Sequence, residues 1–158
     1  MGTNHMGRQS IRFPQPPVVR GFASVAGKKE REGPLGDQFT ATVQDTTFGE
    51  KSWERAERRM QQMTLELALE KAGLTDADLD AAFAGDLLNQ CIGSSFSLRN
   101  RGVPTLGLYG ACSTMAESLL LAAMSVSGGY ARTALAMTSS HFASSERQYR
   151  FPLGYGGQ

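Results

Sequence analysis

The sequence predicts an α/β fold with a mainly parallel sheet. From residue 52 onward, segments with helical periodicity alternate with short apolar segments of the strand type. This alternation is typical of β-α-β units with right-handed crossovers. A second observation is the helical segment 115–126, in which Glu117 is the one charged residue. Because a helix that is apolar on all sides must be covered on all sides, we expect more chain, or a second subunit, on the side that the sheet leaves open.

The composition narrows the classes of function. The 158 residues are the size of one ordinary domain, and a net charge of +1 gives no reason to expect nucleic acid as a partner. Cys91 and Cys112 form no C-x-x-C pair and the two histidines lie far apart, so we expect no metal site and no cofactor. Residues 1–10 lack the apolar core of a secretory signal, which predicts reduced thiols and a cytoplasmic location.

The first part of the chain contains few regular elements. Residues 1–10 are polar and are interpreted as a flexible leader, followed by one domain over residues 11–158. Residues 18–25 (VVRGFASV) are predicted to form a first strand. Residues 27–37 hold three glycines and a proline among charges, which is typical of an exposed loop, and residues 40–43 are predicted to be extended.

The first clear helix covers residues 52–72. Its apolar side chains recur at spacings of three and four and form one stripe, which we expect to face the core. The members of this stripe are Trp53, Ala56, Met60, Met63 and Leu67. Gly73 follows at the position of a left-handed C-terminal cap. Thr75 and Asp78 are typical of a capping box that opens a short helix.

Strands and helices then alternate to residue 138. The predicted elements, in chain order, are strand 81–85, helix 94–101, strand 103–109, helix 115–127 and strand 132–138. Glycines follow both helices, which supports their predicted ends. Residues 139–158 are polar and rich in glycine and are interpreted as a tail.

Cys112 lies where an apolar strand gives way to the helix 115–127. Amide groups at such a turn are free of intrahelical hydrogen bonds, and the helix dipole adds partial positive charge. Both effects favour a thiolate and can hold a developing oxyanion, as at other strand-turn-helix nucleophile sites. The alternative is that Cys112 only fills space, because cysteine is often buried without reacting. Cys91 has no helix start beside it and is predicted to be structural.

The segment GACSTMAESLLLAA, at residues 110–123, resembles the active-site cysteine segment of the thiolase superfamily. This resemblance implies a fold in which two similar halves pack into five layers, αβαβα, with the cysteine-bearing helix in the middle layer. The chain is then expected to be the amino-terminal half of such a fold, with the second half absent. Other catalytic residues of that superfamily come from the second half, so none can be placed here.

Four segments carry a closer resemblance: VVRGFASVAGKKEREGPLGDQF, GDLLNQ, YGACSTMAES and TSSHFASSERQYRFPLGYGGQ. Together they resemble the stage V sporulation protein AD family of spore-forming bacteria, from about residue 11 to the end. The resemblance implies a protein that binds dipicolinic acid, alone or as its calcium chelate, and supports its uptake into the developing spore. It also implies other stage V sporulation proteins as partners, a location peripheral to the spore inner membrane, and no demonstrated catalysis.

Dipicolinate is a flat aromatic dianion, so its site needs donors or cations near both carboxylates and an apolar slot for the ring. The candidate ligand-binding residues are Cys112, Ser113, Thr114, His141, Asp86 and Asn89. Amides at a helix start suit anions, and the carboxyl ends of parallel strands bring the other candidates to the same edge. His141 is a candidate donor. Asp86 would repel a dianion unless calcium or a proton intervened.

Two other interpretations stay open. In the first, the protein is an acyltransferase in which Cys112 accepts an acyl group from coenzyme A. In the second, the protein is a scaffold subunit and Cys112 only packs. In each case, the apolar surface of the helix 115–127 is expected to favour a homodimer or aggregation of the isolated chain.

Overall fold

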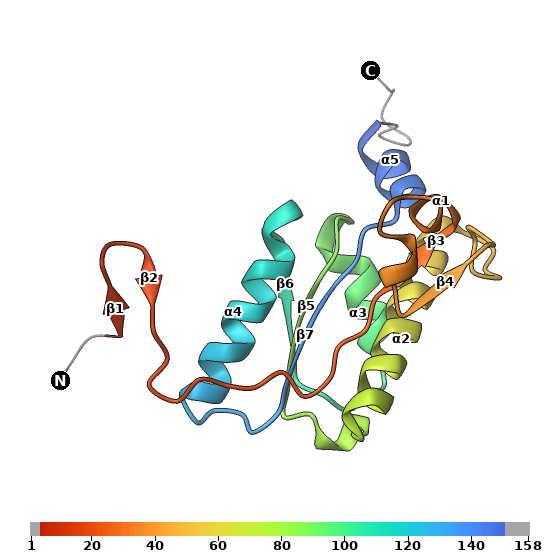
Figure 1. The fold of residues 1–158 in the computed structure, drawn as a ribbon. Helices are drawn as coiled ribbons and strands as arrows, with labels where there is room; N and C mark the ends of the chain where they lie inside the picture. The colour runs from red at the N-terminus through yellow and green to blue at the C-terminus, as the bar shows by residue number, and fades with distance from the viewer. Residues whose placement is uncertain (1–3, 151–158) are drawn as a thin grey trace.

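A computed structural model describes residues 4–150 and contains a three-stranded parallel sheet (Figure 1). The central strand is β5 (Ala81–Gly85). β6 (Thr105–Leu108) and β7 (Ala134–Thr138) pair with it on either side, both in the parallel sense. In this register, Phe83 lies between Leu106 and Ala136. The predicted order of parallel strands with helical crossovers is therefore confirmed.

Helices cover both faces of this sheet (Figure 1). α4 (Thr114–Ser127) lies against one face, and α2 (Trp53–Ala72) and α3 (Ile92–Leu98) lie against the other. The hydrophobic core fills the space between the sheet and these last two helices. Its fully buried members are Leu65, Ala82, Ala84, Leu98 and Met137. Burial of apolar area, worth about 25 cal/mol per Å², holds these layers together.

The ends of α2 follow the sequence signals. The Ser52 hydroxyl accepts a hydrogen bond from the Arg55 amide at 3.3 Å, and Gly73 adopts the left-handed conformation with φ of 64°. The capping box is also present: the Thr75 amide donates to Asp78 Oδ2 at 2.8 Å at the start of the 3-10 helix η2 (Asp76–Asp78). These local predictions are confirmed because each depends on neighbours in the sequence.

The predicted buried stripe of α2 is wrong. The buried residues of the helix are Ala56, Glu57, Gln61 and Leu65. Of the predicted stripe, only Ala56 is buried. The helix is rotated from the expected orientation because Glu57 and Gln61 find hydrogen-bond partners inside the protein: Ser139, Ser144 and Ser97. A buried polar side chain is tolerated when it is hydrogen-bonded, so polar residues occupy a face that a hydrophobicity pattern assigns to solvent.

The predicted strand 18–25 is also largely wrong. Only its last residue belongs to β3 (Val25–Gly27), which pairs in parallel with β4 (Ala41–Val43). Residues 18–20 and 22 are exposed, with Val18 at 80%. Gly21 packs closely against α2, where a Cβ atom would lie 2.7 Å from the carbonyl oxygen of Ala68.

Other segments are more ordered than predicted. Within residues 4–11, β1 (His5–Met6) and β2 (Ser10–Ile11) form an antiparallel hairpin with exposed residues. The expected loop 27–37 contains the short helix α1 (Lys28–Arg31) and, at its end, the 3-10 helix η1 (Gly36–Gln38).

The expected tail begins with a helix, α5 (Phe142–Arg150), which lies near the starts of α2 and α3 in Figure 1. The remainder of the predicted tail, 151–158, lies outside the described residues. The tail prediction was wrong for residues 142–150, because serine and charged residues give a weak helical pattern in isolation. Contacts with the strand connections, described below, hold α5 in place.

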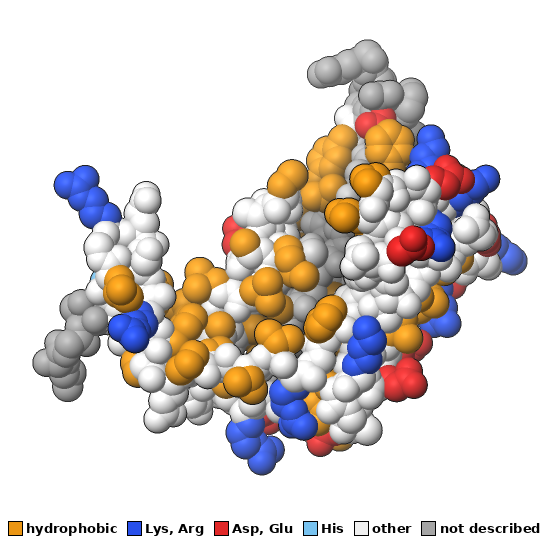
Figure 2. Space-filling model, in the orientation of Figure 1, with side chains coloured by type: hydrophobic (Ala, Val, Ile, Leu, Met, Phe, Trp, Pro, Cys, Tyr) orange, Lys and Arg blue, Asp and Glu red, His pale blue; other side chains and the backbone are white. Residues whose placement is uncertain are grey.

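One face of α4 is buried against the sheet and the other is exposed. The buried residues are Thr114, Ser118 and Ala122. Large apolar side chains that are 44–49% exposed are Met115, Leu119, Leu120 and Met124. Figure 2 shows hydrophobic side chains gathered over this helix. The sheet thus covers only one side, as the sequence predicted. Of the helices between residues 4 and 150, none combines the length and apolar character needed to cross a membrane.

We expect the chain to self-associate through the exposed face of α4. Replacing Leu120 and Met124 with lysine should weaken association at least about tenfold, because each apolar side chain contributes about 1.5–3 kcal/mol when buried. Sedimentation velocity over a concentration series measures the change. The matched control replaces Leu35 and Phe96, which are exposed away from α4, and should leave association unchanged. A monomeric wild-type chain with a cooperative melting transition would contradict the expectation.

Candidate functional site

The three parallel strands end at one edge of the sheet, which we call the carboxyl edge. β5 continues there into residues 86–91, β6 into residues 109–113 and β7 into residues 139–141. Open α/β sheets bind ligands at this edge. Each residue that the sequence predicted for a ligand site lies on one of these connections or at the start of α4.

Cys112 is exposed on a sharp turn between β6 and α4. It lies in the 3-10 segment η4 (Ala111–Ser113), and α4 begins directly after this segment. Ala111 has a φ of 49°, a left-handed conformation that is uncommon for residues other than glycine. The strand-turn-helix connection predicted from the sequence is therefore present, and it leaves the Cys112 side chain open to reagents.

The two residues after Cys112 have internal partners. The Ser113 hydroxyl lies 2.7 Å from the Gly110 carbonyl oxygen and 2.9 Å from Glu117 Oε1. Thr114 is buried, and its hydroxyl accepts a hydrogen bond from the Gly110 amide at 3.2 Å. Glu117 therefore brings a negative charge to the turn that was expected to attract anions. A dianion bound here needs a cation or additional donors to offset this repulsion.

Asp86 is fully buried and holds the connection after β5. Its carboxylate accepts hydrogen bonds from the Leu88 amide at 2.9 Å, from the Ser94 amide at 2.7 Å and from the Ser94 hydroxyl. These bonds fix a turn in which Gln90 and Cys91 both have positive φ, at 59° and 51°. They also satisfy a free amide in the first turn of α3. The contacts of Asp86 are thus those of a structural carboxylate.

The second cysteine is buried in this turn. The Cys91 thiol donates to the Leu108 carbonyl oxygen at 3.1 Å, which ties the β5 connection to β6. Burial raises the pKa of this thiol, with the nearby Asp86 carboxylate acting in the same direction. Cys91 is therefore placed as an unreactive thiol. The expectation that no helix starts beside it is wrong, because α3 begins at Ile92 with Cys91 as its N-cap, and burial is what makes the thiol unreactive.

Asn89 contributes its backbone amide to the contacts of the carboxyl edge. This amide donates to Gln148 Oε1 of α5 at 2.8 Å. Tyr149, the next residue of α5, donates its hydroxyl to the Leu87 carbonyl oxygen, and this hydroxyl also meets that of Tyr109. The hydrogen bond with Tyr109, followed by partial burial, raises the pKa of Tyr149 to about 12. Helix α5 thus lies across the edge and adds the phenol group of Tyr149, which pairs with that of Tyr109; the sequence analysis missed both groups.

His141 contacts residues other than Cys112. Its Nε2 donates to the Thr46 carbonyl oxygen at 2.9 Å, and its ring lies 5.5 Å from that of Trp53. Nδ1 is buried without a hydrogen-bond partner. Cys112 follows β6 and His141 follows β7, which are the two outer strands, with β5 between them. The structure therefore places both residues at the predicted edge but gives them separate contacts.

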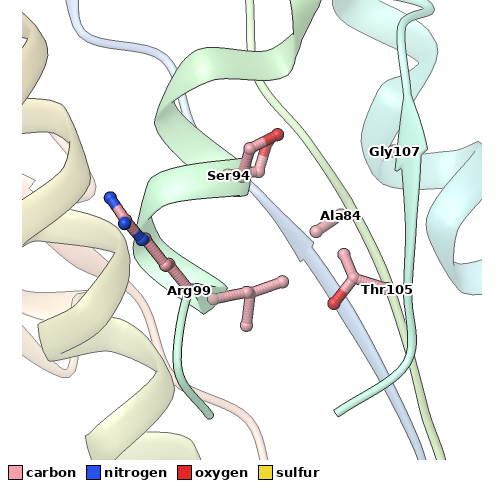
Figure 3. A pocket seen from close by; sticks show the side chains of 7 residues that line it. Ala84, Ser94, Arg99, Thr105 and Gly107 are labelled. Atoms are coloured by element: carbon pink, nitrogen blue, oxygen red, sulfur yellow. The ribbon is translucent and has the colours of Figure 1, made fainter. Parts of the chain in front are cut away.

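A hollow of about 320 Å³ lies between α3 and the strands β5 and β6 (Figure 3). Three of its polar lining residues have other partners: Ser94 binds Asp86, Thr105 donates to the Val103 carbonyl oxygen, and Arg99 lies over the Phe96 ring. In Figure 3 the Arg99 guanidinium points away from Ala84 and Thr105. The hollow therefore lacks the convergent donors that a dianion requires.

A buried carboxyl group, Glu57, is a second feature that the sequence analysis missed. Its side chain is enclosed between α2, the end of β7 and α5, where Ser139 and Ser144 contact it. Burial raises the pKa of Glu57, and these two hydroxyl groups act in the opposite direction. Within residues 4–150, no group of three or more histidine, cysteine or acidic side chains is arranged to hold a metal ion.

Comparison with known sequences identifies a close group of relatives. The profile of the family described as stage V sporulation protein AD matches residues 7–158. Stage V sporulation protein AD of Bacillus subtilis (strain 168) is 44% identical over 152 residues, which cover 96% of this chain and 45% of the relative. The chain thus spans a little under half the length of that relative.

Comparison with solved structures gives the fold. A 3-oxoacyl-(acyl carrier protein) synthase III from Xanthomonas oryzae pv. oryzae aligns with a TM-score of 0.51 over 74% of this chain and 41% of its own. The priming β-ketosynthase of the R1128 polyketide pathway aligns with a TM-score of 0.53 over 85% of this chain and 45% of its own. Both are 16% identical in sequence. These likenesses confirm the predicted thiolase-like fold.

The two cysteines are expected to differ strongly in reactivity. Cys112 is exposed, whereas Cys91 is buried and hydrogen-bonded, so iodoacetamide should modify Cys112 at least about tenfold faster under native conditions. Peptide mass spectrometry over a time course measures both rates. A Cys112→Ala variant should take up almost no label until denaturant is added. Equal labelling rates in the folded protein would show that the turn at residues 86–91 is not closed as described.

Proposed function

The chain belongs to the stage V sporulation protein AD family, and from this membership we propose that it binds dipicolinic acid and supports its uptake into the developing spore. It is a sporulation protein on a thiolase-like scaffold. The observation that carries the proposal is the 44% identity to the Bacillus subtilis protein over 96% of this chain. The ligand itself comes from the resemblance of the sequence to this family.

The carboxyl edge is the proposed ligand site. At the Cys112 turn, the Ser113 amide donates to the Gly110 carbonyl oxygen at 3.0 Å and the Thr114 amide to that of Ala111, so the amides proposed for the ligand are those of Ala111 and Cys112. Tyr109 and Tyr149 offer aromatic surface, and their hydroxyl groups pair with each other and with the Leu87 carbonyl oxygen. Tyrosine rings suit a flat ring that carries polar groups, because one side chain supplies both kinds of contact. The Glu117 carboxylate beside the turn favours the calcium chelate over the free dianion, since calcium prefers oxygen ligands and offsets the repulsion. Asp86 and His141 then act mainly by shaping the edge.

The proposal includes a place in the cell and protein partners. The protein works at the cytoplasmic side of the spore inner membrane, as a peripheral component together with other stage V sporulation proteins. The exposed apolar face of α4 supports an assembly larger than one copy of this chain, because monomers rarely expose such a surface. A homodimer is the simplest such assembly.

An acyltransferase is the second candidate function. The observation that favours it is the exposed Cys112 on a scaffold shared with a 3-oxoacyl-(acyl carrier protein) synthase and a ketosynthase. In this reaction the Cys112 thiolate attacks the carbonyl carbon of an acyl-coenzyme A thioester. The bond from that carbon to the sulfur of coenzyme A breaks, the coenzyme leaves as its thiolate, and the acyl group remains on Cys112.

Dipicolinate binding is tested by calorimetry, with and without calcium, on this chain and on the Bacillus subtilis relative. We expect heat that saturates, and weaker binding of pyridine-2-carboxylate, which lacks one carboxylate. Tyr109→Phe should weaken binding about five- to tenfold, the loss of one hydrogen bond of about 1–1.5 kcal/mol. Tyr130→Phe is the matched control, because Tyr130 is 88% exposed beyond the opposite end of α4. Absence of saturable heat from both proteins would overturn the proposal.

Acyl transfer is tested by incubating the protein with acetyl- and longer acyl-coenzyme A and measuring its intact mass. An acyltransferase would gain one acyl group, and Cys112→Ser would abolish the rapid, hydroxylamine-sensitive adduct. Cys91→Ser should acylate like the wild type because Cys91 is buried. We expect no adduct if the protein is a binding protein alone. A stoichiometric adduct on Cys112 would establish the second function in place of the first.

A further inference from the structure

Glu57 connects α2 to the segment that joins β7 and α5. Its side chain is fully buried, with 0% of the residue exposed. Oε1 lies 2.7 Å from the hydroxyl of Ser139, directly after β7, and Oε2 lies 2.5 Å from the hydroxyl of Ser144, in the first turn of α5. One carboxyl group thus touches both sides of the connection that leads into α5.

The hydrogens available to these contacts can be counted. At Ser139 the count is complete: Gln61 Nε2 donates to the Ser139 hydroxyl, and this hydroxyl donates to Glu57 Oε1. At Ser144, one hydroxyl hydrogen lies between two acceptors: Glu57 Oε2 and the His141 carbonyl oxygen, at 2.9 Å, which also accepts from the Ser145 amide at 3.1 Å. With a hydrogen on Glu57 Oε2, Glu57 donates to Ser144 and the Ser144 hydroxyl keeps its hydrogen bond to the His141 carbonyl oxygen, so each of these contacts has its own hydrogen.

The surrounding charges act on Glu57 in both directions: Asp86 raises its pKa and His141 lowers it. Asp86, at the end of the neighbouring β5, repels a second carboxylate. The His141 ring donates from Nε2 to the Thr46 carbonyl oxygen, and its buried Nδ1 has no hydrogen-bond partner. No lysine or arginine side chain that the structure describes forms an ion pair with Glu57. Burial raises the pKa of Glu57 more than the serine hydroxyls lower it.

We propose that Glu57 is protonated in the folded protein and anchors α5 across the carboxyl edge, so that ionisation of Glu57 releases this helix. The far end of α5 is held by the Tyr149 hydroxyl and by Gln148, both at an exposed surface. These contacts are replaceable by water, whereas a buried carboxylate lacking a counter-ion is costly. Lifting of α5 hydrates the charge and opens the edge. The role of α5 as a lid rests on the proposed function, but its attachment does not.

The direction of the pH dependence follows from the raised pKa. A carboxyl group whose pKa is higher in the folded than in the unfolded protein stabilises the folded state fully below its ordinary value of 4.5. This stabilisation is lost as the pH rises through the raised pKa. Attachment of α5 is therefore strongest in mild acid and weakens with increasing pH. Release of α5 at low pH would be the opposite of this mechanism.

Hydrogen exchange of the α5 amides over a pH series, corrected for the intrinsic pH dependence of exchange, is the test. In the wild type, opening of α5 should rise at least about tenfold across the transition. Glu57→Gln keeps the shape and the donor of the neutral acid, so α5 should stay closed at every pH. Glu70→Gln, an exposed position on the same helix, should behave like the wild type. A Glu57→Gln variant that opens with pH as the wild type does would overturn the proposal.

Two further measurements test the proposal without relying on the Glu57→Gln variant. Ser144→Ala should open α5 at all pH values, whereas Ser145→Ala should not, because the Ser145 hydroxyl is buried without a hydrogen-bond partner. Infrared difference spectra of the wild type should show the carbonyl band of a protonated carboxyl group at neutral pH, and its absence would overturn the proposal. If the switch is present but dipicolinate does not bind, only the proposed function fails. If dipicolinate binds and α5 does not respond to pH, only this inference fails.

Discussion

The carboxylate of Asp86 is the constraint on which the carboxyl edge depends. In the interior, it accepts hydrogen bonds from two backbone amides and one hydroxyl group. Each of these donors would be costly to bury without a partner. The turn that it fixes carries the Leu87 carbonyl oxygen and the Asn89 amide that receive α5, and the Cys91 thiol that reaches β6. Gly85 just before it cannot carry a side chain, because a Cβ atom would meet the Leu108 carbonyl oxygen and the Thr114 methyl group. Strand, turn, helix start and lid therefore meet at one buried charge.

The sequence predicts those parts of the fold that depend on short-range chemistry. The three parallel strands, the caps of α2 and the position of α4 follow from local composition and spacing, and the structure confirms them. The errors occur where distant residues decide. Residues 18–24 have the composition of a strand, but they run outside the sheets, with Gly21 packed closely against α2. The buried face of α2 is polar because serines up to 87 positions away satisfy Glu57, which no helical pattern reveals.

In the candidate site, too, some features follow from the sequence and others depend on distant residues. Parallel strands dictate that Asp86, Cys112 and His141 reach one edge, and they do. Their orientation depends on partners that the sequence does not indicate: backbone amides for Asp86 and the Thr46 carbonyl oxygen for His141. The phenols that line the edge were missed, because Tyr149 comes from a segment whose polar composition does not mark it as a helix. The order and direction of the strands decide which residues reach the carboxyl edge. The contacts of each residue decide where its side chain points.

The two buried carboxyl groups near this edge differ in the donors that surround them, and this difference separates their roles. Asp86 receives two backbone amides, which are fixed in place and can only donate, together with the Ser94 hydroxyl. Glu57 contacts only hydroxyl groups, which rotate and can accept as well as donate, so they can also accept a hydrogen bond from a protonated Glu57. Repulsion between the two groups means that a negative Asp86 makes a neutral Glu57 more favourable. The fixed charge that shapes the β5 connection thus also biases the group that holds the helix lying across it.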